Sequence, residues 1–129
     1  MKDIKKPARL SGLKIKKMEN LLTSVLAIAA ANPFGFTVSI NDLSVPVSGY
    51  AVAAAETQNS FGPSGLADVL ILAPALGAQF VGGWLDEETG KFYFDATFVV
   101  DDLEEAKELG RRNGQIAIFN LSNGEEIRL

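Results

Sequence analysis

The fold expected for this chain is decided by the stretch from position 80 to position 121, FVGGWLDEETGKFYFDATFVVDDLEEAKELGRRNGQIAIFNL. Between positions 92 and 100 every even position is apolar, and the odd positions hold Tyr93, Asp95, Thr97 and Val99. Successive side chains of a strand point to opposite faces, so this pattern predicts a strand with one apolar face. Phe94 lies within that face, away from both strand ends, and we expect it to be a core anchor.

A shorter run, 80–85, precedes this strand and contains the pair Gly82-Gly83. The two runs are joined by the residues 86–90, DEETG, in which acidic residues are followed by a glycine. This composition suits a type I turn closed by a left-handed residue. The stretch therefore predicts a β-hairpin, with Trp84 anchoring the packing at its end.

The next segment predicts a helix over 102–113. Asp102 can cap its start with Glu105 at capping-box spacing, and Asn113-Gly114 supply a left-handed stop. A β-rich run follows at 115–121, and the turn at 122–124 leads into a last strand ending at Leu129. A strand–helix–strand unit predicts that the 115–121 strand runs parallel to a strand of the same sheet.

The N-terminal segment 1–31 permits two interpretations. Its basic start and the eleven-residue run 21–31 resemble a secretory signal with an A-x-A exit. Apolar positions from Ile15 to Ala29 nevertheless keep helical spacing across the supposed boundary. We therefore expect an amphipathic helix ended by Asn32-Pro33. We expect no membrane span, because the run is too short to cross a bilayer. A cytoplasmic protein is expected accordingly.

The middle of the chain predicts two more strands and one more helix. The runs 36–40 and 47–55 are expected to pair with each other, and the alanines at 51 and 53–55 leave room for the first helix above them. Ser64 is expected to cap a helix that Pro74 and Gly77 bring to an end. One apolar face of that helix is formed by Leu66, Val69, Leu70 and Ala73.

At 129 residues and 47% apolar content, the chain is expected to form a single α+β domain over 1–129. We predict a mostly antiparallel sheet of four to six strands with about three helices. A β-hairpin followed by a β-α-β unit belongs to this sheet. The domain comprises a basic N-terminal arm, 1–17, and a hairpin–helix–hairpin half, 80–129.

The composition argues against most enzyme chemistry. The chain has neither cysteine nor histidine, which excludes thiolate and imidazole chemistry. The acidic turn 86–88 lacks the alternating ligand spacing of a calcium loop and is expected to be solvated. We expect Asp95 to face solvent or to bond neighbouring backbone, and the alternative is a buried carboxyl with a raised pKa. We assign no catalytic, cofactor-binding or metal-binding residue.

Charge is unevenly distributed along the chain. Residues 1–17 contain seven basic residues and Asp3, a net charge of +6, whereas residues 18–129 contain five basic and fifteen acidic residues, a net charge of −10. The arm is expected to be solvated or to dock on the acidic surface of the chain. The alternative is an arm that binds nucleic acid or anionic lipid, opposed for nucleic acid by the acidic body.

Loops carry binding residues more often than cores do, so the polar connection 56–65 is the main candidate for function. The candidate interaction residues are Gln58, Asn59, Phe61, Trp84 and Gln115. We expect a small non-catalytic protein-interaction or accessory protein that binds a protein partner or itself. The alternatives are nucleic-acid binding through the arm and a carboxylate-dependent enzyme built from Asp95 and Glu56.

The last part of the chain also carries a resemblance. It has a G-W-x-D-x-x-[TS]-G hairpin at 83–90, a D-x-x-x-A helix at 102–106 and an N-x-Q-x-A-I strand at 113–118. This order resembles a segment that recurs in uncharacterised bacterial and phage proteins and accompanies large polyvalent proteins of mobile elements. The resemblance covers roughly the last 50 residues. It implies a fold and an origin but no activity.

Overall fold

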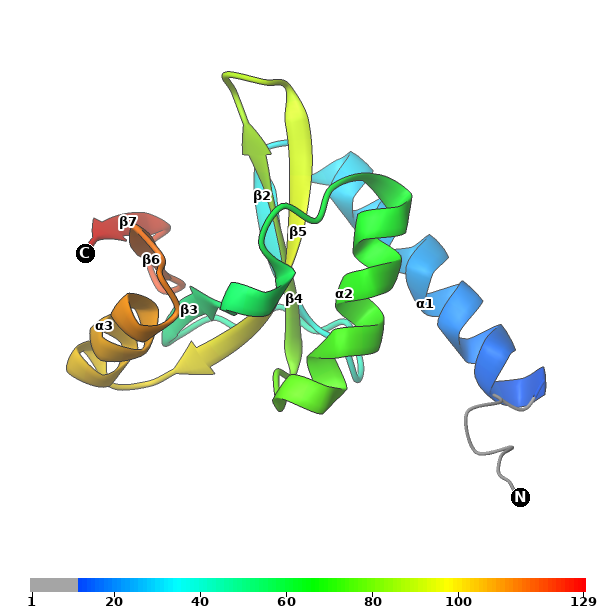
Figure 1. Ribbon diagram of the computed structural model, residues 1–129, viewed down its shortest axis with the longest axis horizontal. Coiled ribbons are helices and arrows are strands. Elements are labelled where there is room, and N and C mark those ends of the chain that lie inside the picture. Colours follow the sequence, from blue (N-terminus) through cyan, green and yellow to red (C-terminus); the bar gives the residue numbers. More distant parts are fainter. Residues whose placement is uncertain (1–11) are drawn as a thin grey trace.

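The computed structural model describes residues 12–129, apart from the side chains of Leu13 and Lys14, and shows an α+β fold (Figure 1). The helices are α1 (Gly12–Ala31), α2 (Gly62–Leu76), α3 (Leu103–Arg112) and the short 3-10 helix η2 (Ala55–Thr57). The strands are β2 (Gly35–Ser39), β3 (Tyr50–Ala53), β4 (Phe80–Asp86), β5 (Lys91–Val100), β6 (Ala117–Asn120) and β7 (Glu125–Arg128). They form one antiparallel sheet in the order β2-β4-β5-β3-β6-β7. The expected fold class is confirmed.

The predicted β4–β5 hairpin is confirmed, and its tip extends beyond the rest of the sheet (Figure 1). Gly90 has the left-handed φ of 75° that the turn requires. The carboxylate of Asp86 accepts hydrogen bonds from the Glu88 N–H, at 3.1 Å, and from the Thr89 hydroxyl, at 3.0 Å. Asp86 is therefore part of the turn rather than a freely solvated acid.

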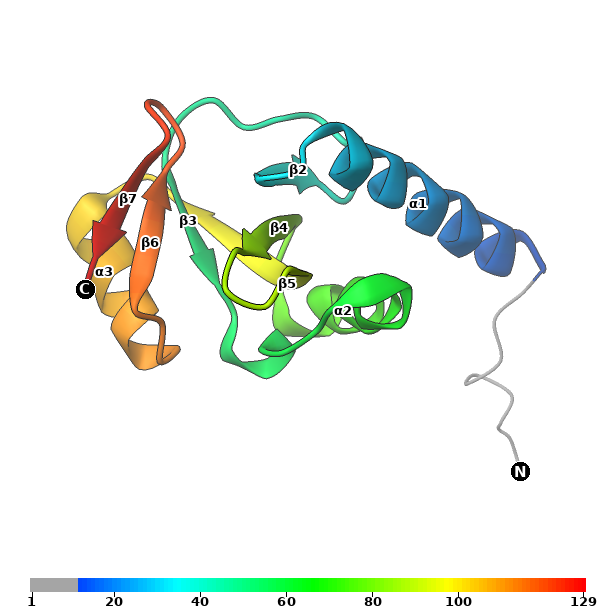
Figure 2. The same ribbon diagram turned by 90° about the horizontal axis from the view of Figure 1, so that it is seen from above.

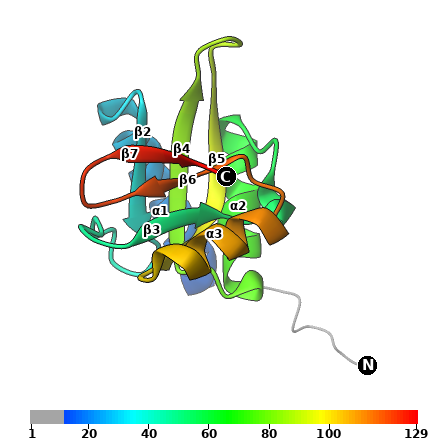
Figure 3. The same cartoon turned by 90° about the vertical axis from the view of Figure 1, so that its left-hand side faces the viewer.

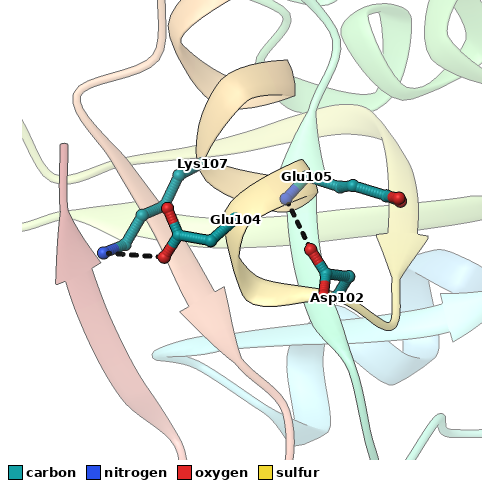
Figure 4. A network of polar contacts seen from close by, with 4 residues as sticks. All are labelled: Asp102, Glu104, Glu105 and Lys107. Atoms are coloured by element: carbon teal, nitrogen blue, oxygen red, sulfur yellow. Dashed lines mark hydrogen bonds and ion pairs between the residues drawn. The ribbon is translucent and has the colours of Figure 1, made fainter.

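Helix α3 begins as the sequence predicts. The Asp102 carboxylate accepts a hydrogen bond of 3.0 Å from the Glu105 N–H, and Lys107 lies 3.8 Å from Glu104 on the helix surface (Figure 4). Gly114, with a φ of 70°, follows the end of the helix. A short polar signal at each end thus sets the length of α3.

The predicted β-α-β unit is present, but another strand divides it. β3 pairs antiparallel with both β5 and β6, so β5 and β6 run parallel with β3 between them. The sheet is strongly twisted, and β3, β6 and β7 run crosswise to β2, β4 and β5 (Figure 3). The β6–β7 hairpin is also confirmed, with β6 beginning at Ala117 rather than at position 115.

All three α-helices pack on the same face of the sheet. The register places Val38, Val81, Phe94, Val52 and Ile118 on one face, and these residues belong to the two hydrophobic cores of the molecule. The larger core joins α1 and α2 to β2, β4 and β5, whereas the smaller one joins α3 to β3 and β6 (Figure 2). We call the opposite face, which no helix of residues 12–129 covers, the open face.

Gly83 allows β2 to lie beside β4. Phe36 of β2 stacks on Phe92 of β5 across this glycine, with ring centroids 6.1 Å apart and planes 9° from parallel. A Cβ at position 83 would lie 2.3 Å from Phe36 Cε1 and 2.6 Å from Phe92 Cε2. The close approach of the two rings therefore requires a residue without a side chain.

The prediction that 36–40 pairs with 47–55 is wrong. β2 pairs with β4, and β3 pairs with β5 and β6, so the β4–β5 hairpin lies between the two strands. The prediction assumed that neighbours in sequence are neighbours in the sheet. The hairpin is longer and more apolar than either strand, and it takes the central position.

The expected place of the first helix is also wrong. The helix itself exists as α1, but α1 packs on α2 and β2, and it is α3 that covers β3. Ala51 and Ala53 point to the open face, so none of the described helices packs against them. On the helix face, Ala106 of α3 and Val52 of β3 are both fully buried in the smaller core.

Helix α2 buries the predicted face, Leu66, Val69, Leu70 and Ala73, but it has different ends. It begins at Gly62, and the N-cap residue Phe61 makes no side-chain hydrogen bond to the helix. Pro63 lies in the first turn, where a residue without an N–H is tolerated. Ser64 is therefore not its cap. Pro74 lies inside the helix, and Gly77, with a φ of 78°, ends it.

The predicted basic arm falls mostly outside the described residues. Lys16 and Lys17 lie on the first turns of α1 and are exposed. Among residues 12–129, no helix has both the length and the apolar character needed to cross a membrane.

Phe94→Ala is expected to lower the free energy of unfolding by about 3–5 kcal/mol, because it removes a buried ring and leaves a cavity. Phe94 is 3% exposed in the larger core. The matched control is Phe34→Ala, since Phe34 is 76% exposed, and it should change stability by about 0.5 kcal/mol or less. Denaturant unfolding measures both, and equal losses would contradict this assignment of the core.

Candidate functional site

A row of aromatic side chains crosses the open face at the base of the projecting hairpin. The register places Trp84 of β4 opposite Tyr93 of β5, and Phe61 forms an isolated antiparallel bridge with Tyr93. Residues directly opposite each other in a sheet share a face. We call Trp84, Tyr93 and Phe61 the aromatic strip.

The three rings of the aromatic strip are in contact. Trp84 stacks on Tyr93 with centroids 5.0 Å apart, and Phe61 meets Tyr93 edge-on at 5.7 Å. Trp84 is 48% exposed and Phe61 is 45% exposed. The Nζ atom of Lys91 lies 4.4 Å from the centroid of the Phe61 ring, within cation–π distance. The strip is thus an ordered and accessible aromatic surface.

The connection that carries Phe61 is fastened along the edge of β5. The Thr57 hydroxyl accepts a hydrogen bond of 3.0 Å from the Ala96 N–H, and the Phe94 N–H donates to the Ser60 carbonyl at 2.7 Å. Thr57 is almost completely buried, whereas Gln58 and Asn59 between these anchors are exposed. Asn59 has a left-handed φ of 67°. Two exposed polar side chains therefore lie on a fixed backbone beside the strip.

The structure joins two of the five residues predicted to interact, Phe61 and Trp84, through Tyr93, and Gln58 and Asn59 precede Phe61 in the same connection. Gln115 is apart from them, in the connection between α3 and β6, and its side-chain amide donates to the Asn113 carbonyl at 3.2 Å. That hydrogen bond gives Gln115 a structural role. Trp84 packs on Tyr93 near the end of the hairpin, and about half of its surface remains exposed.

Asp95 lies on the open face in the row next to the aromatic strip, opposite Gly82. Its carboxylate accepts a hydrogen bond from the Thr97 hydroxyl. A Cβ at position 82 would lie 2.9 Å from Asp95 Oδ1 and 2.7 Å from Thr97 Oγ1. The side chains of Asp95 and Thr97 therefore lie in the space that a side chain at position 82 would occupy. Burial raises the pKa of Asp95 to about 6, and the hydrogen bond from Thr97 opposes this rise.

This arrangement supplies only one half of an acid–base pair. Asp95 is engaged by Thr97, whereas Glu56 is exposed on η2. General acid–base hydrolysis by carboxylates uses two groups facing the same bond. In the part of the chain that the structure describes, no group of three or more acidic, histidine or cysteine side chains could hold a metal ion.

Comparison with known proteins identifies no relative. No family model matches the chain, and neither a curated protein nor a solved structure matches it.

The stability of Asp95→Asn relative to wild type is expected to increase as pH rises from about 4 to about 7, because the wild-type protein loses stability over this range. Below the ordinary value of 3.8 the carboxyl is protonated whether the chain is folded or not. Between 3.8 and about 6 only the unfolded chain ionises, so the wild-type protein loses stability with rising pH. The full loss is at most about 3 kcal/mol.

Denaturant unfolding of both proteins at several pH values between 4 and 7 measures this difference. Asp101→Asn, which removes an exposed charge just beyond the end of the same strand, controls for the change in net charge. A stability difference between Asp95→Asn and wild type that is independent of pH would contradict the burial of this carboxyl.

Proposed function

We propose that this chain is a non-catalytic protein-interaction or accessory protein that binds its partner through the aromatic strip. The observation that carries the proposal is the stacked, half-exposed pair Trp84–Tyr93 with Phe61 beside it. An origin in a bacterium, a phage or a mobile element is part of the proposal and rests on the resemblance of the last part of the chain.

Aromatic residues held in this way are typical of binding hot spots. Trp and Tyr are enriched where truncation weakens binding most, because they offer a large contact area with few rotatable bonds. Here the stacking of Trp84 on Tyr93 and the bridge from Phe61 already order the rings before any partner arrives. The strip itself would therefore lose little further conformational freedom on binding a partner.

The charge around the strip favours a basic partner. Glu87 and Glu88 are exposed at the tip of the hairpin that carries Trp84 and Tyr93. The body of the chain, residues 18–129, has a net charge of −10. Arginine combines positive charge with a planar group that stacks on Trp and Tyr. We infer that the partner presents an arginine-bearing segment to the strip.

The free strand edges are less suitable for binding. At β2 the Gly35 N–H donates to the Asn32 carbonyl and the Ser39 N–H donates to the Ser44 carbonyl, so the outer edge is partly satisfied. β7 is short and carries exposed Glu126 and Arg128, 3.8 Å apart. Short, charged or capped edges resist the addition of another strand.

Nucleic acid is the second candidate, because exposed aromatic rings also stack on bases. Lys91 beside Phe61 is the cation at the strip that would favour it. The phosphate backbone would meet Glu87 and Glu88, and the acidic body would repel it. The charges therefore favour a basic protein partner over nucleic acid.

Selection of random 12-residue peptides against the wild-type protein tests the proposal. We expect the selected peptides to be enriched in arginine. Their affinity should fall about 30-fold or more for a Trp84→Ala/Tyr93→Ala variant, since hot-spot truncations cost about 2 kcal/mol or more. Phe119→Ala is the matched control, because Phe119 is an aromatic residue of the open face, 43% exposed, on β6.

Peptides that bind the double variant as well as they bind wild type would overturn the strip as the contact surface. Enrichment in acidic peptides would overturn the charge argument. A single-stranded oligonucleotide bound at physiological salt more tightly than the selected peptides would favour the second candidate. Concentration-dependent size that the double variant abolishes would identify the partner as a second copy of the chain.

A further inference from the structure

An apolar hollow lies on the helix side of the molecule and borders the aromatic strip, because Phe61 lines both. Its volume is about 500 Å³, and it is bounded by the end of α1, the start of α2 and the start of β5. Its walls include Leu26 and Ala29 of α1, Pro63 of α2, and Phe92 and Phe94 of β5. The hollow is open to solvent rather than enclosed, and mostly apolar walls are common in small-molecule sites.

The hollow contains one charged residue, Lys91. Lys91 is the only lysine or arginine between positions 18 and 106, a stretch that holds twelve acidic residues. Within residues 12–129 the ion pairs join other side chains, and Lys91 Nζ instead lies over the Phe61 ring at the border of the hollow. Among the described residues, no acidic side chain lines the hollow. Within that part of the chain the ammonium group of Lys91 has no carboxylate partner and stands beside an apolar wall.

We propose that this hollow binds a small apolar monocarboxylate, such as a medium-chain fatty acid. The apolar tail would lie against Leu26, Ala29 and Phe92, where it replaces water on partly exposed apolar surface. The carboxylate would accept a charge-assisted hydrogen bond from Lys91 Nζ. A neutral ligand leaves the ammonium group unmatched, and a cationic ligand is repelled by it.

The groups that form the hollow are held independently of any ligand. Phe94 is a buried core residue, and Phe92 is stacked on Phe36. Asn32 donates from its side chain to the Ile28 carbonyl at 2.9 Å, and the Gly35 N–H donates to the Asn32 carbonyl at 3.0 Å. These contacts fix the end of α1 next to β2, so the walls are formed before binding.

Three ten-carbon probes that differ in the head group test the proposal: decanoate, decanol and decylammonium. Each is titrated below its micelle concentration into the full chain, and backbone amide shifts in the ¹H–¹⁵N spectrum report binding. We expect saturable binding of decanoate with shifts centred on Leu26, Phe61 and Phe92. Decanoate should bind about 10-fold more tightly than decanol, the size expected for one charge-assisted contact at an exposed rim, and decylammonium most weakly.

Lys91→Gln should remove the 10-fold preference for decanoate over decanol and leave the affinity for decanol unchanged. The matched control is Lys107→Gln, which removes the same charge from α3, where Lys107 pairs with Glu104. This control should keep the preference. Ala29→Leu, which fills part of the hollow, should weaken binding of all three probes.

Three results would overturn the proposal. The first is decylammonium binding as tightly as decanoate, and the second is an unchanged preference for decanoate in Lys91→Gln. The third is an absence of saturable decanoate binding to the wild-type protein. Because Lys91 is exposed, Lys91→Gln is expected to fold, so the test does not depend on the Ala29 variant.

Discussion

The stacking of Phe36 on Phe92 across Gly83 is the contact on which the arrangement of the molecule depends. It holds β2 against β4, because any side chain at position 83 would occupy the space of the two rings. β2 follows α1 after only three residues, so the place of β2 also sets the place of the end of α1. The larger core and the apolar hollow both form between that end, α2 and β5.

The sequence predicts those parts of the fold whose signals are local. A few adjacent residues are enough to predict each of three features: the alternation along β5, the turn at Gly90 and the Asp102 cap. The structure contains all three. The pairing of β2 with β4 has no such signal. It depends on the fit of Phe36 over Gly83, two residues far apart in the chain, so a preference for neighbouring strands gives the wrong partner.

The candidate site was predictable to a similar degree. The sequence names Phe61 and Trp84 singly as candidate interaction residues, but only the register shows that Tyr93 lies between them. Lys91 was missed, although its position as the only basic residue in a long acidic stretch was a visible signal. The expectation that Asp95 faces solvent or bonds backbone is wrong, because burial raises the pKa of its carboxyl and its hydrogen-bond partner is the Thr97 hydroxyl.

One strand connects these features. In β5 the even positions supply Phe92 and Phe94 to the core and the hollow, whereas the odd positions supply Tyr93 and Asp95 to the open face. The aromatic strip is therefore attached directly to the best-packed strand of the molecule and shares its rigidity. Rigid surfaces lose less conformational freedom on binding than mobile loops do. A substitution that shifts Phe94 would move Tyr93 as well, so stability and binding are coupled through the backbone of β5.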